Sequence, residues 1–174
     1  MQELENFLTS EECREMIEMI DANHSQSSPQ EKDINEVRHS RPTFLDENNE
    51  LVKKLHDKIA NYLQLDKKYA EPLQVQRYEA GQFCTAHHDF YSQDGLDKSF
   101  VNTSGNRTKT FVVYLNDDFR GGQTHFINLN KSIKPKTGKA IYWDNIVNGE
   151  LQTQYLHQGV AVAEGRKYII TSWW

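Results

Sequence analysis

The hydrophobic residues of the N-terminal part have the spacing of two amphipathic helices. Residues 9–12 (TSEE) match a capping box, which predicts a helix start with Thr9 as N-cap and Glu12 reaching back to it. Apolar residues follow at the i, i+3, i+4 and i+7 positions of one helical face, namely Cys13, Met16, Ile17 and Ile20. The polar residues 23–36 predict an exposed loop. A second helix is predicted over residues 49–65, and its buried side carries Leu51, Leu55, Ile59, Tyr62 and Leu63.

From Pro72 onward the pattern changes to a period of two, which is typical of β-strands. Residues 73–78 (LQVQRY) alternate between two faces. Further strand candidates, rich in β-branched and aromatic residues, are 109–116, 123–129, 139–145, 156–163 and 166–174. Many short strands behind a helical front predict a mainly β fold, a β-sandwich or jelly roll with flanking N-terminal helices, and argue against a doubly wound α/β fold. The polar stretch 92–106 is predicted to be a long loop.

Composition and charge narrow the function classes. The chain has 174 residues, long enough for one domain (1–174) with its own core. A net charge of −5 argues against a nucleic-acid partner, since phosphate contacts need clustered Lys and Arg. The acidic start predicts no signal peptide, and no apolar stretch approaches the ~18 residues of a membrane span. Two cysteines, Cys13 and Cys84, cannot build a disulfide framework, so a cytoplasmic location is expected.

The segment His87-His88-Asp89 is the strongest candidate for chemistry. Because alternate residues of a strand share a face, His87 and Asp89 point together and His88 points the other way. With one distant histidine they would form the facial triad of non-haem Fe(II) oxygenases. A zinc site would more often add a cysteine or a third histidine. Cys84, three residues before His87, has the wrong parity for that face.

The residues alone leave the third ligand open. His125 and His157 both lie in predicted strands and are equal candidates. His24, in the polar loop, and His56, on the second helix, are expected to be solvated.

Several longer segments carry a resemblance to a known family. They are QVQRYEAGQFCTAHHD (74–89), NRTKTFVVYLNDDFRGGQTHF (106–126), IKPKTGKAIYWDN (133–145) and LHQGVAVAEGRKYIITSWW (156–174). In this order, with a lysine ten residues after His157, they resemble the 2-oxoglutarate- and Fe(II)-dependent dioxygenases, specifically the prolyl 4-hydroxylase family. The resemblance covers almost the whole chain and implies a double-stranded β-helix, or jelly roll.

The resemblance also implies roles for individual residues. His87, Asp89 and His157 match the iron ligands, and Lys167 matches the residue that binds the distal carboxylate of 2-oxoglutarate. Tyr78 and Thr124 match hydrogen-bonding partners of the same co-substrate. A buried ammonium needs an anionic partner, which makes the role of Lys167 physically reasonable. Trp173 matches an aromatic residue near the substrate pocket, and Cys84 stands where many prolyl hydroxylases have a tyrosine near the substrate.

The implied reaction couples oxidative decarboxylation of 2-oxoglutarate by O2 to hydroxylation of a C–H bond, with release of succinate and CO2. The expected substrate is a proline in an intracellular peptide or protein, and ascorbate is a further cofactor suggested by the family. Cys84 puts that substrate in doubt. The alternatives are the same cofactors acting on a free amino acid or another side chain, or a non-catalytic jelly-roll metal-binding or sensing module. Neither nucleic acid nor membrane is an expected partner, and the oligomeric state is left open.

Two further predictions concern the strand region. If His157, Lys167 and Trp173 all face the interior, the last two strands should form a hairpin with a three-residue loop and a left-handed Gly165. Residues 92–106, directly after the metal strand, are interpreted as a lid over the substrate, with a disordered hairpin tip as the alternative.

Overall fold

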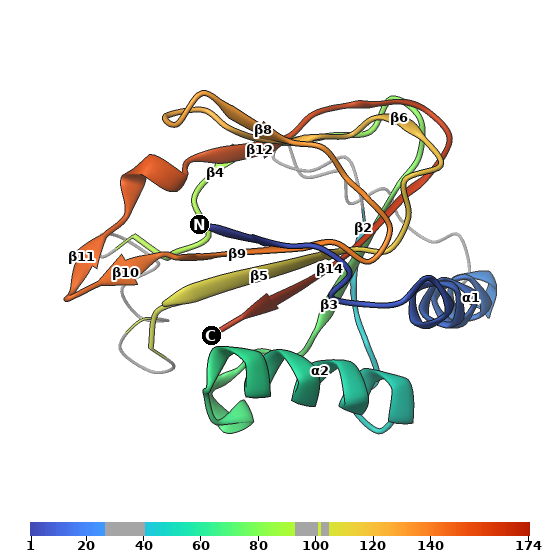
Figure 1. Ribbon diagram of the computed structural model, residues 1–174, viewed down its shortest axis with the longest axis horizontal. Helices are drawn as coiled ribbons and strands as arrows, with labels where there is room; N and C mark the ends of the chain where they lie inside the picture. The colour runs from blue at the N-terminus through green and yellow to red at the C-terminus, as the bar shows by residue number, and fades with distance from the viewer. Residues whose placement is uncertain (27–40, 93–100, 102–104) are drawn as a thin grey trace.

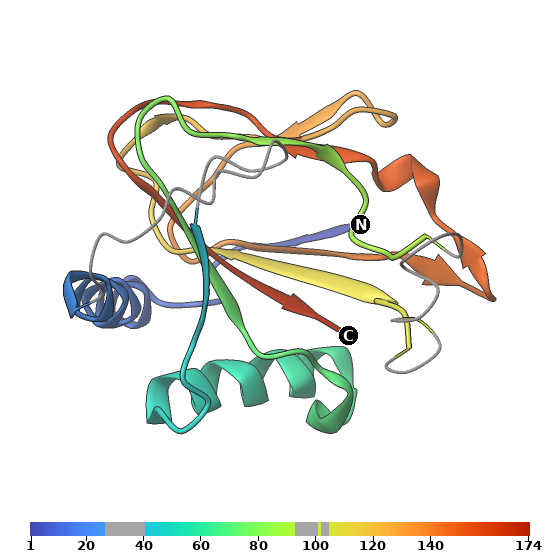
Figure 2. The ribbon, with the colours of Figure 1, turned by 180° about the vertical axis from the view of Figure 1, so that it is seen from behind.

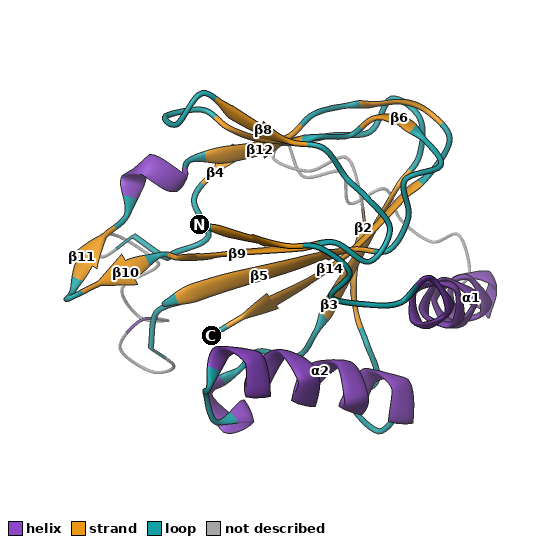
Figure 3. Ribbon diagram, viewed as in Figure 1, coloured by secondary structure: helices purple, strands orange, loops and turns teal. Residues whose placement is uncertain are grey.

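The computed structural model describes residues 1–26, 41–92, 101 and 105–174. Its helices are α1 (Ser10–Gln26) and α2 (Glu50–Leu63), with 3-10 turns η1 (Lys67–Tyr69) and η2 (Thr153–Tyr155). Its strands are β1 (Gln2–Leu4), β2 (Arg41–Phe44), β3 (Gln74–Tyr78), β4 (Cys84–His87), β5 (Lys109–Tyr114), β6 (Arg120–Gly121), β7 (Thr124–Phe126), β8 (Lys131–Ile133), β9 (Ala140–Asp144), β10 (Ile146–Val147), β11 (Glu150–Leu151), β12 (His157–Gly159), β13 (Val162–Glu164) and β14 (Lys167–Trp173). Figure 3 shows these elements by type.

Two antiparallel sheets face each other and form the jelly roll (Figure 1). The major sheet has six strands in the order β1-β9-β5-β14-β3-β2, and the minor sheet has four in the order β4-β12-β7-β8. Seen from behind, the minor sheet again lies above the major sheet, and β2 is the edge strand of the major sheet (Figure 2). The predicted fold class, mainly β with flanking N-terminal helices, is confirmed. Within the described residues, no helix is both long and apolar enough to cross a bilayer.

The helices cover the outer face of the major sheet. At the start of α1 the backbone N–H of Glu12 donates to Thr9 Oγ1 (3.1 Å) and that of Thr9 donates to Glu12 Oε2 (2.7 Å), which confirms the capping box. Cys13, Met16 and Ile20 are buried, as their helical spacing predicts. The helix runs to Gln26, so the predicted loop from residue 23 begins too early.

The second helix is shorter than predicted and one of its predicted core residues is exposed. Asn49 caps it, and a left-handed Gln64 ends it after Leu63. Leu55 and Ile59 are buried, but Tyr62 is 41% exposed. The Tyr62 ring packs edge-on against Phe7 and Tyr142. These contacts cover part of its apolar surface, while the rest of the side chain remains in water.

The central strands of the major sheet are buried on both faces. In β5, Phe111 and Val113 pack with the helices, whereas Val112 and Tyr114 belong to a second core between the two sheets. Every residue of β14 is buried. Because side chains alternate along a strand, Lys167, Ile169, Thr171 and Trp173 share the inner face, and the register places Lys167 opposite Tyr78 of β3. The fold thus presents one row of β14 side chains to the minor sheet.

Candidate metal centre and adjoining pocket

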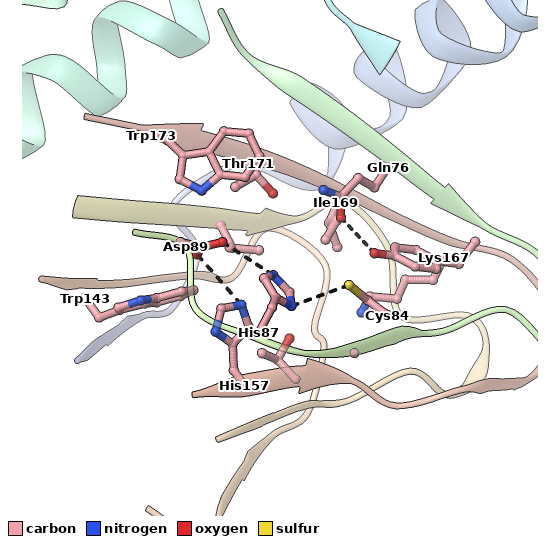
Figure 4. Close-up of a pocket in the computed structure, with 14 residues that line it drawn as sticks. Gln76, Cys84, His87, Asp89, Trp143, His157, Lys167, Ile169, Thr171 and Trp173 are labelled. Atoms are coloured by element: carbon pink, nitrogen blue, oxygen red, sulfur yellow. Dashed lines mark hydrogen bonds and ion pairs between the residues drawn. The ribbon is translucent and has the colours of Figure 1, made fainter. Parts of the chain in front are cut away.

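Three metal-ligating side chains converge between the two sheets. His87 ends β4, Asp89 follows two residues later, and His157 begins β12, which pairs with β4 so that His157 lies opposite His87. His87 Nε2 is 3.4 Å from Asp89 Oδ1, and His157 Nε2 is 3.8 Å from Asp89 Oδ2. One ligand atom from each of the three residues lies within 4.8 Å of the others. Figure 4 shows the His87 and His157 rings next to each other, each joined to Asp89 by a dashed line.

Hydrogen bonds to the backbone set the orientation of both rings. His87 Nδ1 donates to the carbonyl of Thr85 (2.9 Å) and His157 Nδ1 donates to the carbonyl of Tyr155 (3.0 Å). A carbonyl only accepts, so each Nδ1 carries a proton and Nε2 is the ring nitrogen left facing Asp89. The same arrangement orients histidine ligands in metal sites.

The electrostatics of the triad also favour a cation. Burial opposes ionisation of Asp89, but the two nearby imidazoles and a hydrogen bond from Thr110 hold its pKa below the usual range. Burial lowers the pKa of His87, but the hydrogen bond and charge of Asp89 outweigh it and raise that pKa to about 10. For His157 burial prevails and lowers the pKa to about 4. One positive charge is therefore stable beside Asp89, and the residues fit a divalent metal that would replace that proton.

Asp89 is held in place by a buried chain of hydrogen bonds. Thr110 Oγ1 donates to Asp89 Oδ2 (2.8 Å), and Asn145 Nδ2 donates to Thr110 Oγ1 (2.8 Å). Sequence reasoning missed this pair. The signal was a threonine at an inward-facing position of strand β5, directly before the apolar residues Phe111, Val112 and Val113.

Replacing Thr110 with valine, which has the same shape but no hydroxyl, is expected to lower divalent-metal affinity about 10- to 100-fold. Asp89 loses its donor and the buried Asn145 amide loses its acceptor. Titration with Mn2+ followed by calorimetry measures the effect. Thr110→Ser keeps the hydroxyl and is expected to bind as the wild type does; equal affinities for Thr110→Val and the wild type would contradict the support role.

The eight residues to which the resemblance gives a place in the site line one cavity: Tyr78, Cys84, His87, Asp89, Thr124, His157, Lys167 and Trp173. The structure therefore brings together the residues predicted for metal, co-substrate and substrate. Apolar side chains, including Val112, Trp143 and Ile169, form the walls between them.

Cys84 faces this cavity, so the parity argument against it is wrong. In the β4–β12 pairing, His157 lies opposite His87 and Gly159 lies opposite Cys84. Two steps along β12 thus correspond to three along β4, which is the signature of a β-bulge. The extra residue turns Cys84 to the same side as His87, and its Sγ lies 3.7 Å from His87 Nδ1.

Lys167 is a buried cation at the end of the pocket marked by Cys84 (Figure 4). It is 2% exposed, and its Nζ donates to the carbonyl of Gly122 (2.7 Å). Burial lowers its pKa to about 8. Its Nζ also lies 5.2 Å from the centre of the Tyr78 ring and 5.7 Å from that of Tyr114. A buried ammonium with neutral oxygen and aromatic neighbours is suited to a small anion.

The rings of two tyrosines lie near Lys167, and one of these residues was not foreseen. Tyr78 and Thr124 are both buried and line the cavity, and their role as partners of 2-oxoglutarate stays a prediction. Tyr114 Oη and Thr124 Oγ1 are 2.7 Å apart, and burial raises the pKa of Tyr114, so its hydroxyl stays protonated. Tyr114 is a further candidate for anion binding. It was missed because it lies in an apolar strand, where an aromatic residue is usually read as core.

Trp173 lines both this pocket and a second cavity. The second cavity is lined by Tyr69, Glu71, Tyr91, Gly105, Asn106, Arg107, Trp173 and Trp174. The Arg107 guanidinium lies 3.8 Å from the centre of the Trp173 ring and donates to both carboxylate oxygens of Glu71 (2.6 and 2.8 Å). A substrate that reaches the metal centre past Trp173 would contact this pair.

The other described histidines lie outside the triad. His125 is hydrogen-bonded to Ser132 on the outer face of the minor sheet, which rules out one of the two candidates for third ligand. His88 points away from the triad, as predicted, and its Nε2 lies 3.1 Å from the carbonyl of Thr153. His56, expected to be solvated, is instead 4% exposed and packs against Trp174. The side chain of His24 lies outside the described part of the chain, and so does most of the predicted 92–106 lid.

The predicted terminal hairpin does not form. β12 and β13 pair with strands of other ladders, whereas β14 pairs with β3 and β5 of the major sheet. The connection between β13 and β14 leads from one ladder to another. The loop length that a hairpin would need to bring His157 and Lys167 to one face is therefore irrelevant. Gly165 does have a left-handed φ of 81°, and a Cβ there would lie 3.0 Å from the Phe119 side chain. The prediction for Gly165 is confirmed, and the hairpin is wrong.

Known proteins share both the sequence pattern and the fold. Residues 73–174 match the model of the 2OG-Fe(II) oxygenase superfamily. The chain is 31% identical to a protein of Acanthamoeba polyphaga mimivirus named "Putative prolyl 4-hydroxylase", over 98% of this chain and 72% of that protein. It is 30% identical to prolyl 4-hydroxylase 2 of Arabidopsis thaliana, over 97% of this chain and 64% of that protein. The 2OG complex of the viral collagen prolyl hydroxylase from Paramecium Bursaria Chlorella virus-1 superimposes with a TM-score of 0.78, at 28% identity, over 99% of this chain and 93% of that one.

Proposed function

Since the chain belongs to the prolyl 4-hydroxylase family of the 2OG-Fe(II) oxygenase superfamily and is a 2-oxoglutarate-dependent dioxygenase, we propose that it hydroxylates C4 of a proline in a peptide or protein. One O2 and one 2-oxoglutarate are consumed for each C–H bond converted to C–OH. One oxygen atom enters the proline, the other enters succinate, and the keto acid loses CO2.

The observation that carries this proposal is the pairing of a metal triad with a buried cation in one cavity. His87, Asp89 and His157 supply three ligand atoms, and Lys167 lies in the same cavity at 2% exposure. A dicarboxylate that chelates a metal at one end presents a free carboxylate at the other. A metal-binding or sensing module without catalysis has no need for that buried ammonium, so the arrangement favours the enzyme.

In this mechanism His87, Asp89 and His157 would hold the metal, and the rest of the cavity would receive the co-substrate. Fe(II), when bound, would supply the oxidising chemistry. Lys167 would bind the distal carboxylate, with the hydroxyls of Tyr78, Thr124 and Tyr114 nearby. Thr110 holds Asp89 in its orientation, and the walls formed by Val112, Trp143 and Ile169 keep water from the reacting atoms.

Cys84 supports a second candidate substrate. Its small side chain stands where the family pattern often has a tyrosine, and it faces the cavity beside His87. The additional space favours a substrate other than the usual peptidyl proline, either another side chain or a free amino acid. The cofactors would be the same.

Product analysis distinguishes these substrates. The protein, Fe(II), 2-oxoglutarate and O2 are incubated with proline-rich peptides, free proline or no substrate, each with and without ascorbate. Peptidyl-proline hydroxylation predicts succinate formation that depends on the peptide and a gain of one oxygen on its proline. Substrate-dependent succinate with free proline alone would favour the second candidate, and no succinate in any arm would contradict both.

We further propose a cytoplasmic location and an intracellular protein substrate. In the described chain Cys13 and Cys84 are both free and buried, which suits a reducing compartment. Fractionation of the producing cells, with mass spectrometry for proline oxidation in the soluble proteins, tests the location and the substrate together.

A further inference from the structure

Strand β3 carries three buried polar side chains on its inner face. Gln74, Gln76 and Tyr78 alternate with Val75 and Arg77, so they point to the same side. Gln74 and Gln76 are each 6% exposed and Tyr78 is 3% exposed. A buried amide is costly unless its oxygen and nitrogen are both hydrogen-bonded. Two such amides in a row therefore suggest a polar function on this strand.

These three side chains form a directional chain of hydrogen bonds. Tyr78 Oη donates to Gln76 Oε1 (2.8 Å), and Gln76 Nε2 donates to Gln74 Oε1 (3.0 Å). In Figure 4 a dashed line joins the Gln76 oxygen to this tyrosine hydroxyl, at the end of the pocket where Lys167 lies. In the register of the major sheet, Tyr78 lies opposite Lys167 and Gln76 lies opposite the apolar Ile169. Gln76 thus finds its amide partners along β3 itself.

The direction of this chain conflicts with anion binding. A phenol has one proton, and here that proton points to Gln76. A carboxylate beside Lys167 only accepts hydrogen bonds, so Tyr78 must turn its proton to bind one. Gln76 Oε1 would then be a buried acceptor that has lost its donor.

A side-chain amide can resolve the conflict because it carries both a donor and an acceptor. If Gln76 exchanges the positions of Oε1 and Nε2, its nitrogen donates to Tyr78 Oη while Tyr78 donates to the carboxylate. Gln74, whose Oε1 accepts from Gln76 Nε2 in the present arrangement, must reverse with it, so that Gln74 Nε2 donates to Gln76 Oε1. Methionine or leucine at this position could not donate, and glutamate could accept but not donate when ionised.

We propose that Gln76 is a positioning residue for 2-oxoglutarate. In the unliganded protein the Tyr78 hydroxyl donates to Gln76. When the co-substrate binds, the Gln76 amide reverses, and the Tyr78 hydroxyl donates to the co-substrate carboxylate instead. This proposal rests on the proposed function, which places that carboxylate beside Lys167. It concerns co-substrate affinity and leaves the metal ligands unaffected.

The test is calorimetric titration of 2-oxoglutarate, without O2, into Mn2+-loaded wild type, Gln76→Met, Tyr78→Phe and the double variant. Gln76→Met and Tyr78→Phe are each expected to weaken binding about 3- to 10-fold, the effect of one hydrogen bond. The double variant is expected to bind no more weakly than Tyr78→Phe, since Gln76 acts through Tyr78. Gln2→Met, on the exposed strand β1, is the matched control and is expected to bind as the wild type does.

Three results separate the possibilities. Wild-type affinity in Gln76→Met, or multiplied losses in the double variant, would overturn the positioning role and leave the proposed function intact. Failure of the wild type to bind 2-oxoglutarate would overturn both. The wild type also gives a readout that does not depend on variant folding: the Gln76 side-chain NH2 resonances in NMR are expected to move at saturating 2-oxoglutarate, and unmoved resonances would contradict the reversal.

Discussion

Replacing His87 with alanine is expected to abolish hydroxylation and reduce Fe(II) affinity by about two orders of magnitude or more. If a metal-binding free energy of order 10 kcal/mol is shared by three protein ligands, one ligand contributes about 3 kcal/mol, or about a hundredfold in affinity. The carboxylate of Asp89 would also lose the imidazole that lies 3.4 Å from it. Anaerobic metal titration and succinate formation from 2-oxoglutarate measure the two effects.

His88→Ala is the matched control, because it removes an imidazole from the adjacent position. His88 faces away from the triad and interacts with the carbonyl of Thr153 and the ring of Phe90. An exposed hydrogen bond of this kind contributes little, so metal affinity is expected to stay within about threefold of the wild type. Comparable losses in both variants would show that the triad is not the metal site.

Lys167→Met is expected to weaken 2-oxoglutarate binding by about two to three orders of magnitude while raising the stability of the unliganded protein. Removing one partner of a buried charge pair costs about 2–5 kcal/mol of binding. The unliganded protein, however, holds an ammonium whose pKa burial has lowered from 10.5 to about 8. That difference corresponds to about 3 kcal/mol of unfavourable free energy at neutral pH, which methionine does not carry.

Opposite signs for binding and stability distinguish this result from misfolding. Calorimetry gives the affinity, and thermal unfolding without ligand gives the stability. Lys136→Met, at a lysine whose side chain is 57% exposed, is the control and is expected to change neither by much. If Lys167→Met bound 2-oxoglutarate as the wild type does, Lys167 would not be the residue that binds the distal carboxylate.

The lowered pKa of Lys167 also predicts a pH dependence with a definite sign. Only the protonated lysine binds a carboxylate well, so wild-type affinity for 2-oxoglutarate should fall as the pH rises above about 8, approaching tenfold per pH unit. For folding the sign is reversed. The unfolded chain binds more protons than the folded one between about pH 8 and 10.5, so the penalty of Lys167 is complete below pH 8 and declines above it. The stability advantage of Lys167→Met should shrink over the same range.

The helices and most strands were predictable because their signals are local. The capping box at Thr9 and the i, i+3, i+4, i+7 spacing of the first helix need no tertiary information, and the structure confirms both. The period of two similarly located β3, β5, β9 and β14. The fold class followed from the order of these patterns along the chain.

Apart from helix ends and the exposure of Tyr62, the errors concern how elements meet. Cys84 was placed on the wrong face because a bulge between β4 and β12 adds one residue that no pattern reveals. The terminal hairpin was wrong because β13 and β14 join different ladders. His56 was expected in water, and the ring of Trp174, far along the chain, covers it.

The sequence by itself determined which residue types are available for chemistry, and strand alternation placed His87 and Asp89 on one face and His88 on the other. Its motif order also pointed to His157 and Lys167 through resemblance to a family. Only the tertiary structure decided that these residues share one cavity, that Thr110 and Asn145 support Asp89, and that Gln76 holds the proton of Tyr78. The physical reason is range. Periodicity and capping depend on neighbours a few residues apart, whereas a hydrogen bond between sheets depends on register, bulges and crossings that the whole fold determines together.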